Sequence, residues 1–251
     1  SGGVRGKVGD TGVILWGSYV PGTLVNPHGQ EYPDGLNNRA SGLAGVHRSA
    51  GGRRFSGWVH GYRELMSPDG PNLNQAGVSY GQRARLPLAG AHRLYLEQSA
   101  GLVDHHYYAP EELSVRLFSE ITPRFVLSDT LELQCALETR AGGPLSGSLA
   151  AGAGITPELL HRTEKNTGSV SLTLFFTHSS RFASVYPYRR SLYTWSFMPR
   201  ALNGAGLAGA VQWVHRFPGS SILGARAAGE LFFGEPGRSR ATLYLLSRIP
   251  L

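Results

Sequence analysis

The sequence predicts an all-β protein made of long antiparallel strands, and three observations support this. Apolar and polar side chains alternate over many segments, which is the period of a strand whose successive side chains point to opposite faces. The chain has 34 glycines, 15 prolines and 10% aromatic residues, a composition typical of strands joined by turns. Helical heptads and apolar runs of roughly 18 residues are both missing from the sequence.

The clearest pattern lies in two segments, 112–121 and 131–140. Their apolar rows are Leu113, Val115, Leu117, Ile121, Leu131, Leu133, Cys135 and Leu137. We expect a break at Pro123 and a connection over 122–129, giving a hairpin with both apolar rows on the same side. The opposite row carries Arg116, Glu120, Glu132 and Glu138, which is costly in a dry core and favourable against water or paired charges.

The other elements follow from the same reasoning. Residues 1–12 show no pattern and are expected to be a flexible segment, followed by one β-domain over 13–251. Strands are expected at 13–20, 43–48, 55–65, 76–86, 94–102, 145–153, 170–176, 211–217, 222–233 and 240–251, with one or two more within 181–198. Loops are expected at 21–38, 67–72 and 104–111. Thr156 as N-cap and Pro157 at the first position predict a short helix to Arg162.

The charge distribution argues against a nucleic-acid-binding protein. The net charge of +7 comes almost entirely from arginine, because Lys7 and Lys165 are the only lysines. The arginines are dispersed through the strands beside glutamates, whereas nucleic-acid-binding patches usually cluster Lys and Arg. Paired guanidinium groups fit this pattern better.

The single cysteine and the first residues carry little information on function. Cys135 lies in an apolar row, where a small hydrophobic role is expected, and it has no second cysteine for a disulfide. The small residues Ser1, Gly2 and Gly3 suit a mature start after signal-peptide cleavage, and they suit the remnant of an engineered fusion equally well.

Three architectures accommodate this many strands: a membrane barrel, a soluble sandwich or small barrel, and a propeller. The sequence has no repeat of roughly 40 residues, which disfavours a propeller. Several strands are long, aromatics gather near predicted strand ends, and charged residues total 16% against roughly 25% in soluble domains. These features favour lipid around the apolar rows, although a soluble sandwich would show the same alternation.

From Val13 to Leu251 the sequence resembles the class of bacterial outer-membrane β-barrels. The last strand, with Tyr244, Leu245, Ile249 and Leu251, is similar to the alternating C-terminal strand of such proteins, but it ends in Leu after Pro250 instead of an aromatic residue. The resemblance implies a single transmembrane antiparallel barrel in the outer membrane. Bacterial single-chain barrels have even strand numbers, so our count of thirteen implies 12 or 14 strands, with 181–198 as the expected source of the error.

Residues with catalytic chemistry do not form a recognisable motif. His105 and His106 follow Asp104, but neighbouring strand residues point to opposite faces, so we expect no metal site there. Neither a nucleophile elbow nor the compact His, Ser and Asn segment of outer-membrane phospholipases is found. We therefore expect no catalytic residues and no cofactor.

The charged rows are the remaining candidate site. In a barrel they would line the lumen, and the predicted wall residues are Arg83, Arg85, Arg93, Glu97, Arg116, Glu120, Glu132, Arg226 and Glu230. If they face open water, the slight excess of arginine favours anions; if they pair across a narrow lumen, they close it.

Three hypotheses on function follow. The first is a porin-like channel for small solutes, anionic ones among them. The second is a closed barrel that anchors or docks a larger envelope assembly for export or motility, with other envelope proteins as partners besides outer-membrane lipid. The third, a lipid-modifying barrel enzyme with His105 or His106 at the membrane rim, is the least favoured.

Overall fold

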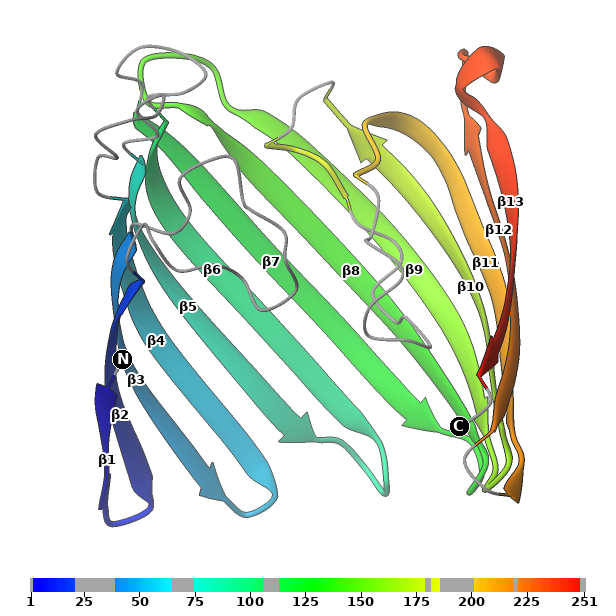
Figure 1. Cartoon of the computed structure of the whole chain (residues 1–251), viewed down its shortest axis with the longest axis horizontal. Helices are drawn as coiled ribbons and strands as arrows, with labels where there is room; N and C mark the ends of the chain where they lie inside the picture. Colours follow the sequence, from blue (N-terminus) through cyan, green and yellow to red (C-terminus); the bar gives the residue numbers. More distant parts are fainter. Residues whose placement is uncertain are drawn as a thin grey trace. The chain divides into compact units, whose positions relative to one another are not determined.

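The computed structural model describes residues 2–20, 39–64, 75–105, 113–178, 182–185, 201–218 and 221–248. In these residues the protein is all-β, and one sheet holds thirteen strands in their sequence order (Figure 1). The strands are β1 (Gly2–Val8), β2 (Thr11–Val20), β3 (Arg39–Ala50), β4 (Arg53–Glu64), β5 (Gln75–Pro87), β6 (Arg93–His105), β7 (Leu113–Val126), β8 (Leu131–Pro144), β9 (Ala150–Arg162), β10 (Asn166–Thr177), β11 (Gly204–Arg216), β12 (Ile222–Phe232) and β13 (Arg240–Arg248). A short 3-10 helix, η2 (Pro236–Arg238), precedes β13. The predicted all-β antiparallel fold is confirmed.

The strands are long, as the alternation predicted. Every strand from β2 to β12 has between 10 and 14 residues. A tilted strand needs about 9–11 residues to cross the hydrocarbon core of a bilayer. The strands are therefore long enough to span one.

The connections between strands alternate in length. Turns from an odd-numbered strand to the next have five residues or fewer, and they comprise 9–10, 51–52, 88–92, 127–130, 163–165 and 217–221. The remaining connections, 21–38, 65–74, 106–112, 145–149, 178–203 and 233–239, are mostly longer. Gly51 and Gly52 have positive φ values of 55° and 75°, as a tight primed hairpin turn requires.

Two local predictions based on proline are wrong. The helix expected over 156–162 is part of strand β9, which pairs with β10 through Leu159 and Val170. Tertiary pairing overrides the helix-start signal there, and the hydroxyls of Thr156 and Thr173 lie 2.9 Å apart where Pro157 lacks an N–H. Likewise Pro123 does not end a strand, because β7 continues to Val126.

The beginning of the chain also differs from our expectation. Part of the segment expected to be flexible, 1–12, forms strand β1, which pairs with β2 from Gly2 opposite Gly17 to Val8 opposite Thr11. The glycines of β1 hide its alternation from the sequence pattern. Most of 181–198 lies outside the described residues. The described part contains thirteen strands, β1 included, and the number of 12 or 14 for the whole chain stays a prediction.

The strands have an apolar and a polar face, defined by cross-strand register. The apolar face carries exposed side chains such as Leu15, Val59, Leu172, Val211 and Leu231, each between 48% and 55% exposed. On the described strands, its only arginines are Arg48, Arg53 and Arg63, all within two residues of a strand end, and it carries no described lysine or acidic side chain. The polar face carries most of the charged residues. A water-soluble sheet packs its apolar face onto a core, whereas here large apolar side chains are exposed on that face.

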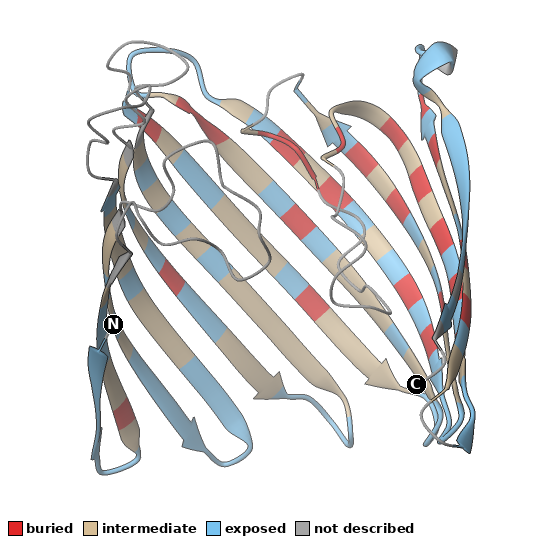
Figure 2. Cartoon of the chain, viewed as in Figure 1, coloured by how far each residue is buried: buried red, intermediate tan, exposed pale blue. Residues whose placement is uncertain are grey.

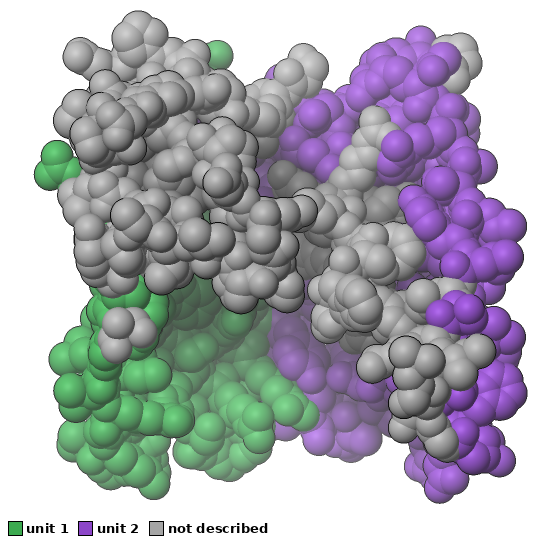
Figure 3. Space-filling view, in the orientation of Figure 1, with its two compact units in different colours: residues 1–86, 96–119, 142–149 green, residues 87–95, 120–141, 150–251 purple. Residues whose placement is uncertain are grey.

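The chain divides into two compact units, coloured in Figure 3. Unit 1 comprises residues 1–86, 96–119 and 142–149, and unit 2 comprises 87–95, 120–141 and 150–251. All described hydrophobic residues that are buried lie in unit 2, and Figure 2 shows buried positions alternating along β9 to β12.

The buried apolar cluster of unit 2 lies on the polar face of its strands. It consists of Phe175, Val185, Leu202, Ala208 and Phe232, and the rings of Phe175 and Phe232 meet edge to face at 5.6 Å. Val185 and Leu202 form an isolated β-bridge. The short segment 182–185 thus packs onto the strand wall, where Gly152 and Gly154 leave room: a Cβ would lie 2.1 Å from the Ala183 carbonyl oxygen and 2.8 Å from Val185, respectively.

Candidate functional site: the polar faces of the two units

In unit 1, the structure brings two of the predicted wall residues together. Arg83 of β5 donates a hydrogen bond from Nη2 to Oε1 of Glu97 in β6 at 2.9 Å. The Arg83 side chain is 61% exposed and its guanidinium carbon lies 5.1 Å from the ring centre of Trp58. Its charge is therefore available to solvent while the aromatic ring and the carboxylate hold its position.

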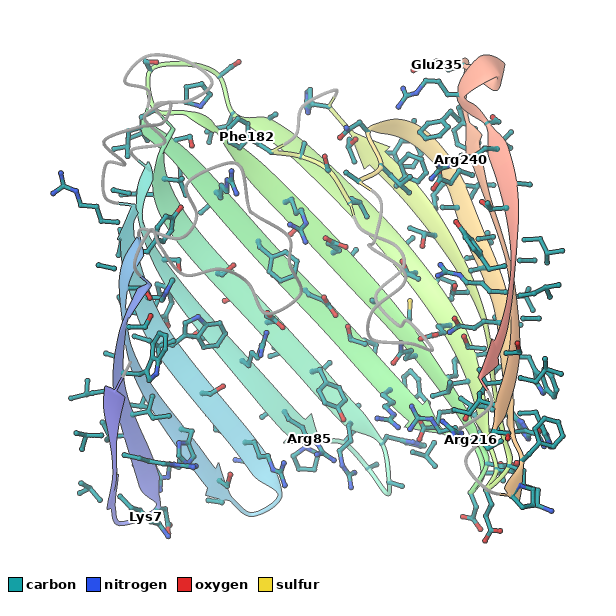
Figure 4. The ribbon with its side chains drawn as sticks, viewed as in Figure 1. Lys7, Arg85, Phe182, Arg216, Glu235 and Arg240 are labelled. Atoms are coloured by element: carbon teal, nitrogen blue, oxygen red, sulfur yellow. The ribbon has the colours of Figure 1, made fainter. Side chains whose placement is uncertain are left out.

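Further cations share this face of unit 1. Arg85 lies near the end of β5 in Figure 4, directly opposite Arg54 of β4 in register. Like charges in cross-strand positions repel one another, and together they make the local potential more positive. The described charged side chains of this face are Arg5, Lys7, Arg54, Arg83, Arg85, Glu97 and Arg116, so cations are in excess.

Aromatic rings on the same face lie across glycines of the neighbouring strand. Trp58 is opposite Gly81 and Tyr62 is opposite Gly77 in register. A Cβ at Gly81 would lie 2.3 Å from the Trp58 ring, and one at Gly77 would lie 2.6 Å from the Tyr62 ring. The missing side chains allow each ring to lie along the sheet, a geometry known as aromatic rescue of glycine.

The polar face of unit 2 is different because its carboxylates are buried and paired. Glu138 is 4% exposed and accepts a hydrogen bond from Nε of Arg140 at 2.5 Å. Glu230 is 5% exposed and accepts two hydrogen bonds from Arg240, at 2.9 and 3.1 Å. Arg240, labelled in Figure 4, lies directly opposite Glu230 in register. Pairing offsets the cost of burying each carboxylate.

Two further carboxylates in unit 2 have polar partners. The Glu158 carboxylate is 7% exposed and accepts a hydrogen bond from the side-chain amide of Gln134. Glu132 forms an ion pair with Arg124. Each of these four carboxylates of unit 2 thus has a cationic or amide partner on the same face.

The remaining predicted wall residues fall in unit 2. Arg226 is 7% exposed and lies opposite Gln212, whose amide donates to the Ser169 hydroxyl at 2.8 Å. Glu120 accepts a hydrogen bond from the Thr122 hydroxyl at 2.7 Å. Arg93 is directed to its own turn, since Nη1 donates to the His92 carbonyl at 2.7 Å. Arg93 therefore stabilises the β5–β6 turn, which the alternation of residues could not show.

Several polar-face residues were absent from the predicted wall. Glu158 was hidden by the expected helix, and Arg124 by the expected break at Pro123. Continuing the alternation of β7 through the proline would have found Arg124. The partner Arg240 lies at the start of its strand, and only the register of β12 and β13 places it opposite Glu230.

Metal-binding and catalytic groups are not assembled in the part of the chain that the structure describes. No group of three His, Cys, Asp or Glu side chains there could hold a metal ion. His105 is the last residue of β6 and its side chain is not described, while His106 lies outside the described residues. Cys135 is a free, half-buried cysteine on the apolar face of β8.

Comparisons with known proteins found no match for the chain. No protein-family model matches the chain, and neither a curated protein nor a solved structure is similar to it. Within the described residues, no helix is both long and apolar enough to cross a membrane.

Proposed function

We propose that the chain is a β-barrel protein of the bacterial outer membrane and that its polar face lines a pore for small solutes, anionic ones among them. The observation that carries the proposal is the apolar face, which exposes many large hydrophobic residues and keeps its few described charges at strand ends. Water disfavours such a surface, whereas lipid favours it. The alternation of short turns with longer connections is also typical of these barrels.

A matched pair of substitutions tests the membrane assignment. Leu172 on the apolar face of β10 is 51% exposed, and its neighbour Ser171 points to the polar face. Leu172→Arg should lower the stability of the protein folded into lipid vesicles by about 2–4 kcal/mol, because it places a charge in hydrocarbon. Ser171→Arg is the control, and its effect should be clearly smaller. Equal effects of the two substitutions would contradict a lipid-facing apolar surface.

The channel hypothesis rests on the polar face of unit 1, where exposed cations outnumber Glu97. Planar-bilayer recordings of the detergent-purified protein should show stable conducting steps, and a salt gradient should give a reversal potential of the sign expected for anion preference. Insertion without conductance would rule out the channel.

A second function is favoured by the polar face of unit 2. Its paired charges and the apolar cluster around Phe175 are features of a filled interior, which suits a closed barrel serving as a membrane anchor or docking part of an envelope assembly. Under this alternative the protein inserts into bilayers without conducting, and affinity purification from cross-linked envelopes recovers a defined partner.

A further inference from the structure

The polar face of unit 1 combines flat aromatic rings with arginines. Four rings lie opposite a glycine of the next strand: Trp16 opposite Gly3, His47 opposite Gly12, Trp58 opposite Gly81 and Tyr62 opposite Gly77. At each glycine a Cβ would come within 3.1 Å of the ring. Each ring therefore lies over the space that a side chain at the opposite glycine would fill.

These rings remain accessible. Trp16 is 42% exposed, and Trp58 and Tyr62 are half-buried. Trp58, His60 and Tyr62 are alternate residues of β4, so they follow one another at about 6.6 Å along the strand. The rings of His60 and Tyr62 are stacked, with centres 6.0 Å apart and planes at 29°. These three side chains form an aromatic row long enough to contact more than one ring of a bound solute.

Basic groups lie beside one end of this row. Arg83 is held over Trp58, and Arg54 and Arg85 oppose each other on the same two strands. Aromatic faces bind the apolar faces of flat rings, while guanidinium groups bind carboxylates in a planar fork. A solute that carries both rings and carboxylates can make both kinds of contact on this face.

We propose that the polar face of unit 1 binds acidic carbohydrates, with sugar rings against Trp58 and Tyr62 and carboxylates toward Arg83, Arg54 and Arg85. The proposal rests on the channel function and specifies its substrate class. A neutral sugar lacks the charge, and a carboxylate without a ring lacks the stacking surface. Both should bind more weakly than an acidic oligosaccharide.

The test compares three probes by calorimetry on the detergent-purified protein: trigalacturonate, the neutral galactotriose, and citrate, which is an anion without a ring. Trigalacturonate should bind at least about tenfold more tightly than citrate, which has no ring to place against the aromatic side chains, and than galactotriose, which has no carboxylate for the arginines. Equal binding of citrate and trigalacturonate would overturn the proposal.

Two pairs of variants place the site. Trp58→Ala should weaken trigalacturonate binding roughly tenfold. Trp213→Ala should leave it unchanged, because Trp213 is 42% exposed on the apolar face of β11. Gly81→Ala should also weaken binding by displacing the Trp58 ring. Its control is Gly57→Ala, where the nearest atom to a Cβ is 3.8 Å away. Unchanged binding in both Trp58→Ala and Gly81→Ala would overturn the proposed site.

Conductance without added sugar separates this proposal from the channel hypothesis. Conducting steps without selective trigalacturonate binding would overturn the carbohydrate site alone. Selective binding that Trp58→Ala weakens, in a protein that does not conduct, would keep the site and rule out the channel. Heat-modifiable migration on a detergent gel verifies that each variant is folded.

Discussion

The polar faces of unit 1 and unit 2 differ in how far their charged side chains are exposed and paired. In unit 1, Arg83 is 61% exposed, and Arg54 opposes Arg85. In unit 2, Glu138 and Glu230 are at most 5% exposed, and each is paired with an arginine. Unit 1 therefore has the features of a solvated, binding surface, and unit 2 those of a structural wall.

The same difference appears in the apolar residues. The described buried hydrophobic residues belong to unit 2, where Phe175 and Leu202 are fully buried. On the polar face of unit 1, aromatic rings lie across glycines and stay accessible. Sheet regions with the same alternation can thus have either a covered or an exposed polar face.

The largest expected effect is on the apolar cluster of unit 2. Phe175→Ala should lower the free energy of unfolding by about 4 kcal/mol, because it leaves a cavity among buried residues. Urea unfolding in detergent micelles, followed by tryptophan fluorescence, measures this. Phe176→Ala is the control, since Phe176 is 55% exposed on the apolar face. Similar losses at both positions would show that the polar face of unit 2 is not a packed core.

A second prediction concerns the ion pair of unit 2 between the buried Glu230 and Arg240, whose side chain is 46% exposed. Arg240→Ala should lower the free energy of unfolding by about 2 kcal/mol, between the values for exposed and buried pairs, because the buried Glu230 carboxylate loses its arginine. Glu230→Gln combined with Arg240→Ala should recover part of the loss, since the carboxylate charge is gone. The corresponding Arg83→Ala in unit 1 should cost less than about 1 kcal/mol, because that pair is exposed. Equal losses of stability for Arg240→Ala and Arg83→Ala would show that the two ion pairs do not differ in their contribution to stability.

The third prediction concerns ion selectivity. Neutralising Arg54 and Arg85 with glutamine should move the reversal potential toward that of a non-selective pore, because the field on this face comes from the cation excess. The matched change in unit 2 is Arg140→Gln with Glu138→Gln, which removes a paired charge of each sign. It should leave the reversal potential unchanged in planar-bilayer recordings. A shift of equal size from the unit 2 variant would place the selective surface elsewhere.

The smallest effect is expected for the exposed pair itself. A double-mutant cycle on Arg83 and Glu97, with alanine at each position, should give a coupling energy of at most about 1 kcal/mol that falls with added salt. Unfolding in low and high salt measures both quantities. A coupling above about 2 kcal/mol, insensitive to salt, would show that the polar face of unit 1 is shielded from solvent.

Alternation in the sequence determined the strand content, the main hairpins and the two faces of the strands. This was possible because the side-chain period of a strand is local and needs no knowledge of neighbours. It also identified Arg83, Arg85, Glu97, Arg116, Arg226 and Glu230 as polar-face residues.

Only the tertiary structure determined which residues face one another across strands and which side chains are buried. Glycines hid β1, and the helix-start signal at Thr156 gave way to pairing of β9 with β10, because cross-strand hydrogen bonds outweigh a weak local preference. Which arginine meets which carboxylate, and which rings lie on which glycines, depends on residues that only register brings together. Burial of Glu138 and exposure of Arg83 follow from what covers each face, which the alternation of a single strand cannot specify.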